Sequence, residues 1–485
     1  MTSGSKTRRV IGPFNRVEGD LEVKIDIDGD RVADAWVTSP LYRGFEHMLV
    51  GKDPRDALVY APRICGICSV SQSVAAATAL RRAQGIRMAP NGELVTSLVL
   101  ACENIADHLT HFYLFFMPDF AREVYARRPW FADTERRFKA VSGSAAQQFL
   151  PARAQFLHLM GMLAGKWPHS LALQPGGTTR AVEAGEKPRL LSLLFGLRTF
   201  LETQLFGAPL EDIVAMSTAP EISRYADTAT NADFRHFLML ADDLKLEQIG
   251  RAANRFMSYG AYEMEGQHQF QPGVWRNGVQ ALDSDAIRED ISHSWLNGGD
   301  TPLHPSTGVT QPSPDSENGY TWCKAPRLGG KVVEVGALAR QLVDGQPLIQ
   351  NLVMESGGNV RNRVVARLIE VARLLPLMEQ WVKDVQAGEP FCFEAAVPES
   401  GSGAGMVEAA RGSLGHWLDI RNGRIHNYQI VAPTTWNFSP RDADEQPGAL
   451  EQALVGAPVM KGETDPVSVQ HIVRSFDPCM VCTVH

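Results

Sequence analysis

The chain has 485 residues, a formal net charge of −8 and 44% hydrophobic residues, the balance of an ordinary globular protein. The negative charge argues against a nucleic-acid partner, because nucleic-acid binding needs a basic face. No run of about 18 uncharged apolar residues is present, so we expect no membrane span. The pair Arg8-Arg9 is not followed by the apolar segment of an export signal. We therefore expect a cytoplasmic protein, unless a partner carries the signal.

The first predicted element is a β hairpin region at residues 9–40. Apolar and polar side chains alternate there on both sides of Asp28-Gly29-Asp30, a pattern typical of two strands joined by a turn. After about residue 91 the apolar residues follow a helical period instead. This predicts long helices at 92–116, 180–205, 233–257, 360–387 and 448–457.

The other segments are interpreted from their glycine and proline content. Residues 259–350 are rich in Gly, Pro, Asn and Ser, which predicts irregular structure with short strands. The run 399–405 predicts a loop that is flexible or exposes its backbone. No repeat of fixed period and no linker is visible. We expect a single domain, 1–485, of the α+β class: mainly helical, with a large helical core and small β appendages.

Seven cysteines are few for this length, and the number is odd, so a disulfide scaffold is not expected. Three are scattered, at Cys102, Cys323 and Cys392. Lone cysteines of this kind are usually small buried hydrophobic residues. The other four form two C-x-x-C pairs, Cys65-Gly66-Ile67-Cys68 near the start and Cys479-Met480-Val481-Cys482 near the end.

In a C-x-x-C turn both thiols can face one point, and two such turns offer four soft ligands for Zn, Fe–S, Ni or Cu(I). A structural zinc site is one interpretation, but its halves usually lie about 15–20 residues apart. Here the halves are about 410 residues apart. A redox disulfide is a second interpretation, but it needs only one pair. The spacing therefore favours a catalytic or redox metal.

The residues around the two pairs resemble the two signature motifs of nickel–iron hydrogenase large subunits. The motifs here are Arg63-Ile64-Cys65-Gly66-Ile67-Cys68 and Asp477-Pro478-Cys479-Met480-Val481-Cys482-Thr483-Val484-His485. The resemblance runs from about residue 9 to the last residue, with further motifs in the family's order. These are Arg16-Val17-Glu18-Gly19, Arg43-Gly44-Phe45-Glu46, His111-Phe112-Tyr113, Gly165-Lys166-Trp167-Pro168-His169, Pro175-Gly176-Gly177, His293-Ser294-Trp295, Lys324-Ala325-Pro326-Arg327, Glu334-Val335-Gly336, Arg411-Gly412 and Pro433-Thr434-Thr435-Trp436-Asn437.

The resemblance implies a catalytic subunit that cleaves H2 reversibly into protons and electrons. Cys65 and Cys479 would be terminal ligands of nickel, while Cys68 and Cys482 would bridge nickel to an iron that carries one CO and two cyanides. A terminal thiolate such as Cys479 can also accept a proton. Glu18 matches the residue that carries this proton away, and a carboxyl beside buried thiolates should have a raised pKa. The related quinone-binding subunit of respiratory complex I shares the fold but lacks the four cysteines.

Other matching residues would surround the metals. Arg411 matches an arginine suspended over them, although Ala410 stands where the family usually has proline. Pro433 and Thr434 match the pair that holds one cyanide.

The C-terminal metal-binding segment, 477–485, would serve a second ion. Glu46, His485 and the backbone carbonyl of Ile430 match the ligands of a buried Mg2+ or similar ion. The three scattered cysteines offer no ligand set for iron–sulfur clusters, so the resemblance implies an obligate heterodimer with an iron–sulfur small subunit.

Several positions differ from the common enzyme pattern and resemble the H2-sensing, regulatory branch of the family. Gln72 and Asp20 each stand where a histidine is usual, and Ile67 and Phe115 replace a frequent Val and Leu. The chain also ends at His485, where most precursors carry a removable extension. Members of this branch turn over slowly, tolerate O2 and report H2 to a histidine kinase. We expect Ile67 and Phe115 to narrow the gas path. An uptake hydrogenase and a complex-I-like structural subunit are the alternatives.

Overall fold

The N-terminal region forms a three-stranded antiparallel sheet. The computed structural model describes residues 7–228, 231–299 and 301–485. Strands β1 (Thr7–Ile11), β2 (Glu22–Asp28) and β3 (Arg31–Thr38) pair in that order. Alternate residues of β2 and β3 are buried, which explains the alternation in the sequence. The predicted hairpin is confirmed, and β1 adds a strand to its edge.

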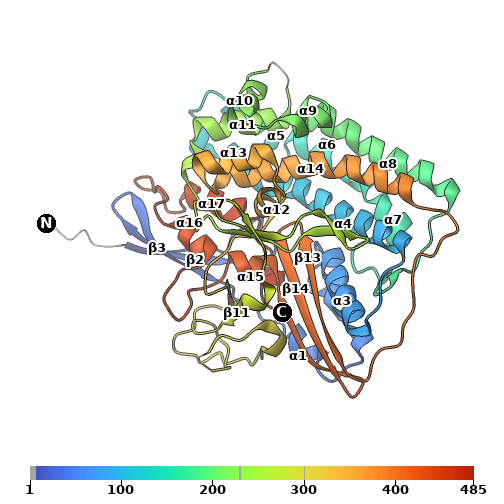
Figure 1. Cartoon of the computed structure of the whole chain (residues 1–485). Helices are drawn as coiled ribbons and strands as arrows, with labels where there is room; N and C mark the ends of the chain where they lie inside the picture. Colours follow the sequence, from blue (N-terminus) through green and yellow to red (C-terminus); the bar gives the residue numbers. More distant parts are fainter. Residues whose placement is uncertain (1–6, 229–230, 300) are drawn as a thin grey trace.

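Three helices pack together above the sheet in Figure 1. Helix α14 (Val360–Asp384) packs against α4 (Pro90–Thr110) and α8 (Lys187–Phe200). Its first turn is capped by Asn359, whose side chain accepts a hydrogen bond from the Asn362 backbone N–H. Helices α4 and α8 each continue into a π-helix, His111–Phe116 and Leu201–Phe206.

A second antiparallel sheet packs against helix α3 (Ser69–Gln84) on the lower right of Figure 1. Its strands are β13 (Gly401–Ala409), β14 (Gly412–Arg421) and β15 (Arg424–Val431). The loop predicted at 399–405 is therefore wrong from Gly401 onward. The glycines serve close packing: a Cβ on Gly405 would lie 1.9 Å from the carbonyl oxygen of Ala75 in α3.

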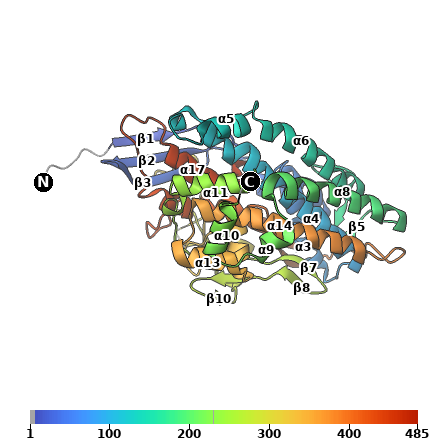
Figure 2. The same cartoon turned by 90° about the horizontal axis from the view of Figure 1, so that it is seen from above.

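The other helices and strands surround these layers (Figure 2). The helices are α1 Phe45–Leu49, α2 Ala57–Tyr60, α5 Phe131–Phe138, α6 Ser144–Phe156, α7 His158–Ala164, α9 Leu210–Ala215, α10 Ala219–Ala226, α11 Asp233–Asp243, α12 Ala337–Val343, α13 Pro347–Ser356, α15 Pro433–Asn437, α16 Ala449–Leu454, α17 Val467–Ser475 and α18 Met480–Thr483. The strands are β4 Leu173–Gln174, β5 Gly177–Thr178, β6 Phe256–Ser258, β7 Ala261–Met264, β8 Gln267–Phe270, β9 Gly273–Trp275, β10 Val279–Gln280, β11 Ile287–Asp290 and β12 Ala325–Leu328.

The helix predictions hold where the apolar periodicity is longest. The segments 92–116 and 360–387 are confirmed as α4 with its π-helix and as α14. The prediction at 233–257 is wrong after Asp243, because Lys245 and Gly250 take left-handed backbone conformations that end the helix. Segment 180–205 is helical only from Lys187, and segment 448–457 is reduced to α16. Segment 259–350 has the short strands expected, together with helix α12, which was not predicted.

The fold brings the two ends of the chain together. One large hydrophobic core includes side chains from Ile11 to Cys482, and a smaller one surrounds Trp417 and Trp436. Helix α17 lies beside the N-terminal strands in both views (Figures 1 and 2), and a β-bridge joins Glu18 to Cys479. Within the described ranges, no helix combines the length and the apolar character needed to cross a bilayer.

Candidate metal centre

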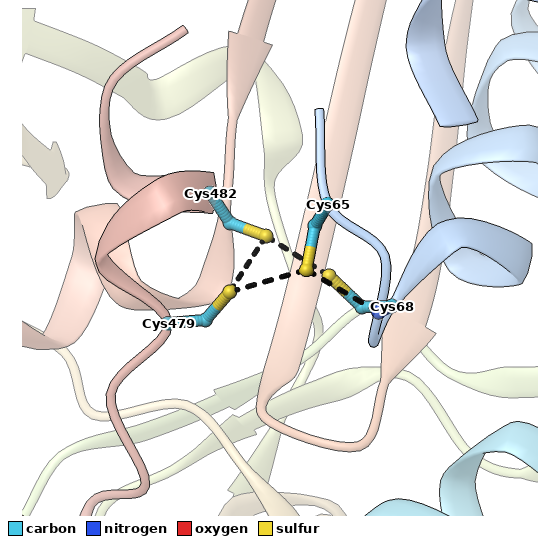
Figure 3. Close-up of side chains that lie close together, drawn as sticks. All are labelled: Cys65, Cys68, Cys479 and Cys482. Atoms are coloured by element: carbon cyan, nitrogen blue, oxygen red, sulfur yellow. Dashed lines mark hydrogen bonds between the residues drawn. The ribbon is translucent and has the colours of Figure 1, made fainter. Parts of the chain in front are cut away.

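The two cysteine pairs meet in the interior (Figure 3). Cys65 and Cys68 lie in the loop before α3, while Cys479 directly precedes α18 and Cys482 lies within it. All four are buried, and their sulfur atoms lie within 4.8 Å of one another. The Cys68 and Cys482 sulfurs are 2.9 Å apart, and those of Cys65 and Cys479 are 3.5 Å apart. In the described part of the chain this is the only such group of cysteine, histidine and acidic residues found.

Short local contacts fix the two cysteine turns. The Cys68 backbone N–H points at the Cys65 sulfur, 3.4 Å away. The carboxylate of Glu103 accepts hydrogen bonds from the backbone N–H groups of Val70 and Ser71, at 2.8 and 2.9 Å, and so anchors the first turn of α3 directly after Cys68. Burial raises the pKa of Glu103 to about 7.

The C-terminal turn is held by hydroxyl groups. The Thr434 hydroxyl accepts a hydrogen bond from the Cys479 backbone N–H at 3.1 Å. The Thr483 hydroxyl donates to the Cys479 carbonyl at 3.0 Å. Pro433 and Thr434 open helix α15 and are buried, so the structure places this predicted pair against the second cysteine turn.

The donor set fits a soft metal cation. Burial raises the pKa of the Cys479 and Cys482 thiols, because thiolates without a counter-charge are costly in an apolar interior. A thiophilic metal ion supplies that counter-charge, and four sulfurs at one point match its preference.

Arg411 is the fixed cation beside this cluster. It is buried, and its Nε donates to the Asp477 carbonyl at 2.9 Å and its Nη2 to the Asp477 carboxylate at 3.1 Å. Its Nη1 pairs with the carboxylate of Asp107, and the Cys479 and Cys68 sulfurs add to the negative field around it. Burial opposes ionisation of both acids. The pKa of Asp477 is nevertheless lowered by Arg411, whereas the pKa of Asp107 rises to about 8.

The loop that carries Arg411 has no proline, but it is anchored in another way. The Ala410 carbonyl accepts a hydrogen bond from Arg340 Nη2 at 3.0 Å, and the Ala409 carbonyl accepts one from Nη1 at 2.7 Å. Arg340 is itself fully buried and paired with Glu370 and Glu408. The position of Arg411 therefore rests on an interior ion-pair network.

Glu18 lies against the C-terminal cysteine turn. Its backbone N–H donates to the Pro478 carbonyl at 3.4 Å, and its carbonyl accepts from the Met480 N–H at 2.7 Å. Glu18 and Cys479 thus form a parallel β-bridge between the two ends of the chain. The side chain is half-buried, and its pKa is raised by burial and then by the charge of Cys65.

A second polar cluster surrounds Glu46. Its carboxylate accepts hydrogen bonds from the Ile430 N–H at 2.8 Å and from the Thr310 hydroxyl, and it lies 3.6 Å from the ammonium of Lys324. The Ile430 carbonyl accepts a hydrogen bond from His485 Nε2 at 2.6 Å, and this nitrogen lies 3.9 Å from the Glu46 carboxylate.

The three predicted ligands of this cluster therefore converge. Glu46, Ile430 and His485 line a cavity of about 10 Å³, enough for about one water molecule or small ion. The Tyr42 hydroxyl also lies on the cavity and has no hydrogen-bond partner among the described residues. Burial lowers the pKa of His485, which keeps the imidazole neutral and able to bind a cation.

The remaining sequence-predicted positions are less closely tied to the centre. Ile67 is half-buried between two of the cysteines, whereas Phe115 is half-buried on the π-helix after α4. Asp20 is exposed, and Gln72 is buried and accepts a hydrogen bond from His416 at 2.8 Å. Of the lone cysteines, Cys102 and Cys323 are buried as predicted. Cys392 is partly exposed, so for it the prediction is wrong.

Sequence reasoning missed two acidic residues of the site, Asp107 and Asp477. One signal for Asp107 was present, since it is an acidic residue in a largely apolar helical segment. Asp477 lies within a recognised motif but had no role assigned. Lys324, which balances Glu46, was likewise part of a motif without an assigned role.

Comparison with known proteins identifies the family. The family model "Nickel-dependent hydrogenase" matches residues 43–148 and 144–485. The chain is 30% identical to the periplasmic [NiFeSe] hydrogenase large subunit of Desulfomicrobium baculatum, across 99% of this chain and 95% of that one. It is 27% identical to the uptake hydrogenase large subunit of Cupriavidus necator, across 99% and 95%.

Solved structures agree with this result. The reduced Ni-Fe-Se hydrogenase of D. vulgaris Hildenborough matches with a TM-score of 0.85 and 29% identity, over 99% of this chain and 100% of that one. The fold is thus that of a nickel–iron hydrogenase large subunit, as the sequence predicted. Together with the four-cysteine cluster, which supports a nickel–iron centre, these matches show that the chain belongs to the nickel-dependent hydrogenase family, as a catalytic large subunit.

Proposed function

We propose that this subunit cleaves H2 reversibly at a nickel–iron centre and acts as a slow, O2-tolerant H2 sensor. The observation that carries the catalytic part is the convergence of four buried cysteine sulfurs within 4.8 Å. In this proposal Cys65 and Cys479 would hold nickel, and Cys68 and Cys482 would hold both nickel and iron. When bound, the centre supplies the chemistry that separates H2 into two protons and two electrons.

The chain's own residues hold the centre and move the proton. Arg411 is a fixed positive charge that cannot lose its proton, and it is suited to hydrogen-bonding a cyanide on the iron. Pro433 and Thr434 would hold the other cyanide from the side of the second cysteine turn. Glu18 accepts a proton at its carboxylate from the Cys479 side, and its raised pKa brings it closer to neutral pH.

Two further components complete the proposal. A divalent ion such as Mg2+ fits the cavity of Glu46, His485 and the Ile430 carbonyl, because oxygen and imidazole donors face a space of the right size. The three cysteines outside the centre are scattered in the sequence, so electrons need another polypeptide to leave. We infer an iron–sulfur small subunit as an obligate partner, and treat residues 1–485 as one domain of this heterodimer.

The sensor role is supported by the residues at four positions. Asp20, Gln72, Ile67 and Phe115 differ from the common enzyme pattern. Gln72 shows how such a change is accommodated: its amide oxygen accepts from His416, which in turn bonds the Tyr428 hydroxyl at 2.7 Å. The proposed signalling partner is a histidine kinase in the cytoplasm. The rival function is respiratory uptake of H2, which the names of several relatives favour.

A tagged copy of the complex, purified from its native host, separates these functions. We expect a histidine kinase to co-purify and its autophosphorylation to change when H2 is added, with slow H2 oxidation and the complex in the cytoplasmic fraction. A membrane-bound complex that reduces a cytochrome b with H2, and no kinase, would establish the uptake function instead. A purified complex that contains no nickel would favour the third alternative, a structural subunit without catalytic activity.

A further inference from the structure

A buried carboxylate outside the cysteine cluster joins the two segments that form the proposed proton site. Asp119 lies on the short 3-10 helix Met117–Ala121 and is fully buried. One of its oxygens accepts a hydrogen bond from Arg16 Nη2, and the other accepts one from Arg474 Nη1 at 2.7 Å. The two arginines come from opposite ends of the chain, so a single side chain clamps both ends.

Each arginine lies close to a residue of the proposed proton site. Arg16 is two residues before Glu18, and Arg474 is in the last turn of α17, five residues before Cys479. Arg474 also reaches the N-terminal segment directly, because its Nη2 donates to the backbone carbonyl and to the side-chain oxygen of Asn15, both at 2.8 Å.

The backbone on both sides of the clamp is bent in the same way. Arg16 has a φ of 54° and Asp477 a φ of 58°, each two residues before its functional residue. A left-handed conformation is unfavourable for a residue with a long side chain, whereas Asp adopts it more readily. The Arg16 side chain, through Asp119 and the Phe115 carbonyl at 3.3 Å, therefore holds a conformation that the backbone alone disfavours.

The clamp is an ionised network in a dry interior. His471 Nδ1 lies 3.6 Å from the Asp119 carboxylate, and His471 Nε2 is hydrogen-bonded to the Tyr125 hydroxyl at 2.7 Å. Burial alone would raise the pKa of Asp119, but His471, Arg474 and Arg16 lower it, so the carboxylate stays charged. Removing this charge leaves two buried arginines without their shared partner, which weakens the contact between the segments to the Arg474–Asn15 hydrogen bonds and the Glu18–Cys479 bridge.

We propose that Asp119 is a positioning residue for proton transfer, which clamps the Glu18 segment onto the Cys479 segment through Arg16 and Arg474. The inference rests on the proposed role of Glu18. It predicts that the Glu18 carboxylate moves relative to the Cys479 sulfur when the clamp is weakened, while the four cysteines keep their positions relative to one another. A displacement of about 1 Å at a reacting group can slow a reaction about 100-fold.

The test compares Asp119→Asn with a matched control, Asp233→Asn, in the purified heterodimer. Asp233 is also a buried carboxylate, bonded to Arg137 at 2.6 Å and to the Tyr113 hydroxyl at 2.8 Å, but it contacts neither segment. The first readout needs no catalysis: amide hydrogen exchange, followed by mass spectrometry. We expect peptides covering 13–20 and 476–482 to exchange about tenfold faster or more in Asp119→Asn and at the parental rate in Asp233→Asn.

The second readout is H2/D+ exchange at equal nickel content, with Glu18→Gln measured alongside. We expect both Glu18→Gln and Asp119→Asn to lose at least about tenfold, and Asp233→Asn to remain within about twofold of the parent. Parental activity in Glu18→Gln would refute the proposed role of Glu18. Loss in Glu18→Gln, combined with parental amide and H2/D+ exchange in Asp119→Asn, would refute the clamp alone.

A milder variant covers the case in which Asp119→Asn does not assemble. Arg16→Gln removes only the N-terminal half of the clamp and leaves the buried pair of Asp119 and Arg474 intact; the Arg16 side chain is 20% exposed, so its loss is tolerable. Faster amide exchange confined to residues 13–20, with lower H2/D+ exchange, supports the proposal. If Arg16→Gln shows the parental rates of amide exchange and of H2/D+ exchange, the proposed clamp is refuted.

Discussion

Two buried clusters share the C-terminal segment, and they differ in how their charge is balanced. At the cysteines, Arg411 is already paired with Asp107 and Asp477. At Glu46, the ammonium of Lys324 neutralises part of the acidic charge without any ion. A metal cation is therefore needed to balance four thiolates at the first cluster, whereas Lys324 already balances part of the acidic charge at the second. From this difference we expect nickel and iron to be obligatory for the first cluster, and the proposed divalent ion to have a supporting role at the second.

The largest expected effect comes from breaking the sulfur cluster. Cys482→Ser removes a soft donor whose sulfur lies 2.9 Å from those of both Cys68 and Cys479, so nickel should fall below a tenth of the parental content and H2 activity should disappear. Elemental analysis of the purified complex measures the loss. Cys323→Ser, a change at a buried cysteine outside the cluster, should keep its nickel. Stoichiometric nickel and activity in Cys482→Ser would refute the ligand assignment.

A smaller effect is expected at the second cluster. Glu46→Gln should lose the divalent ion, keep nickel, and lower the free energy of unfolding by about 1–3 kcal/mol, because Lys324 loses one of its partners. Lys324→Met should instead bind the divalent ion more tightly, because only the ion then balances the charge of the Glu46 carboxylate. Magnesium content and the Tm shift on adding a chelator measure both. Equal chelator sensitivity in parent and Lys324→Met would show that the ammonium does not balance this site.

His416, which links the two clusters, should make the free energy of unfolding depend on pH. His416 connects Gln72, four residues after Cys68, to Tyr428, two residues before Ile430, and burial holds its pKa well below 6.5. Below pH 6.5 the unfolded chain binds a proton that the folded chain does not, so stability falls with decreasing pH. The slope is at most about 1.4 kcal/mol per pH unit for this residue. Urea unfolding at pH 7.5 and 5.5 should show a shallower loss in His416→Gln than in the parent, and an identical loss would exclude this role.

The smallest effect on anaerobic H2 oxidation is expected from substitutions along the proposed gas path. Ile67→Val with Phe115→Leu should leave anaerobic H2 oxidation within about twofold of the parent, but activity should decline progressively under O2, because removing methylene groups from a dense interior widens a passage. Ile67 lies between two cysteines and Phe115 is half-exposed, so Ile67→Val alone should carry most of the change. If the double variant keeps its metals and its activity after long exposure to O2, Ile67 and Phe115 only fill space in the core and do not control gas access.

The sequence predicted what depends on residue type and periodicity. The two cysteine pairs could be recognised because soft donors at fixed spacing have few other uses, and α4 and α14 because their apolar period is long. The strand at Gly401–Ala409 could not, since glycine there serves contact with Ala75 and Ala79 in α3, which only the tertiary structure creates. Asp119 was missed for the same reason: its partners are about 100 and 350 residues away in the chain.

Infrared spectroscopy of the purified heterodimer, with and without H2, tests the central claim most directly. Iron-bound CO and cyanide absorb where protein groups do not, so the bands report the centre itself. We predict one CO band and two cyanide bands that shift when H2 is added and return when it is removed. A nickel-loaded preparation without these bands, or with bands that do not respond to H2, would contradict the assignment of this chain's four cysteines to a working nickel–iron centre.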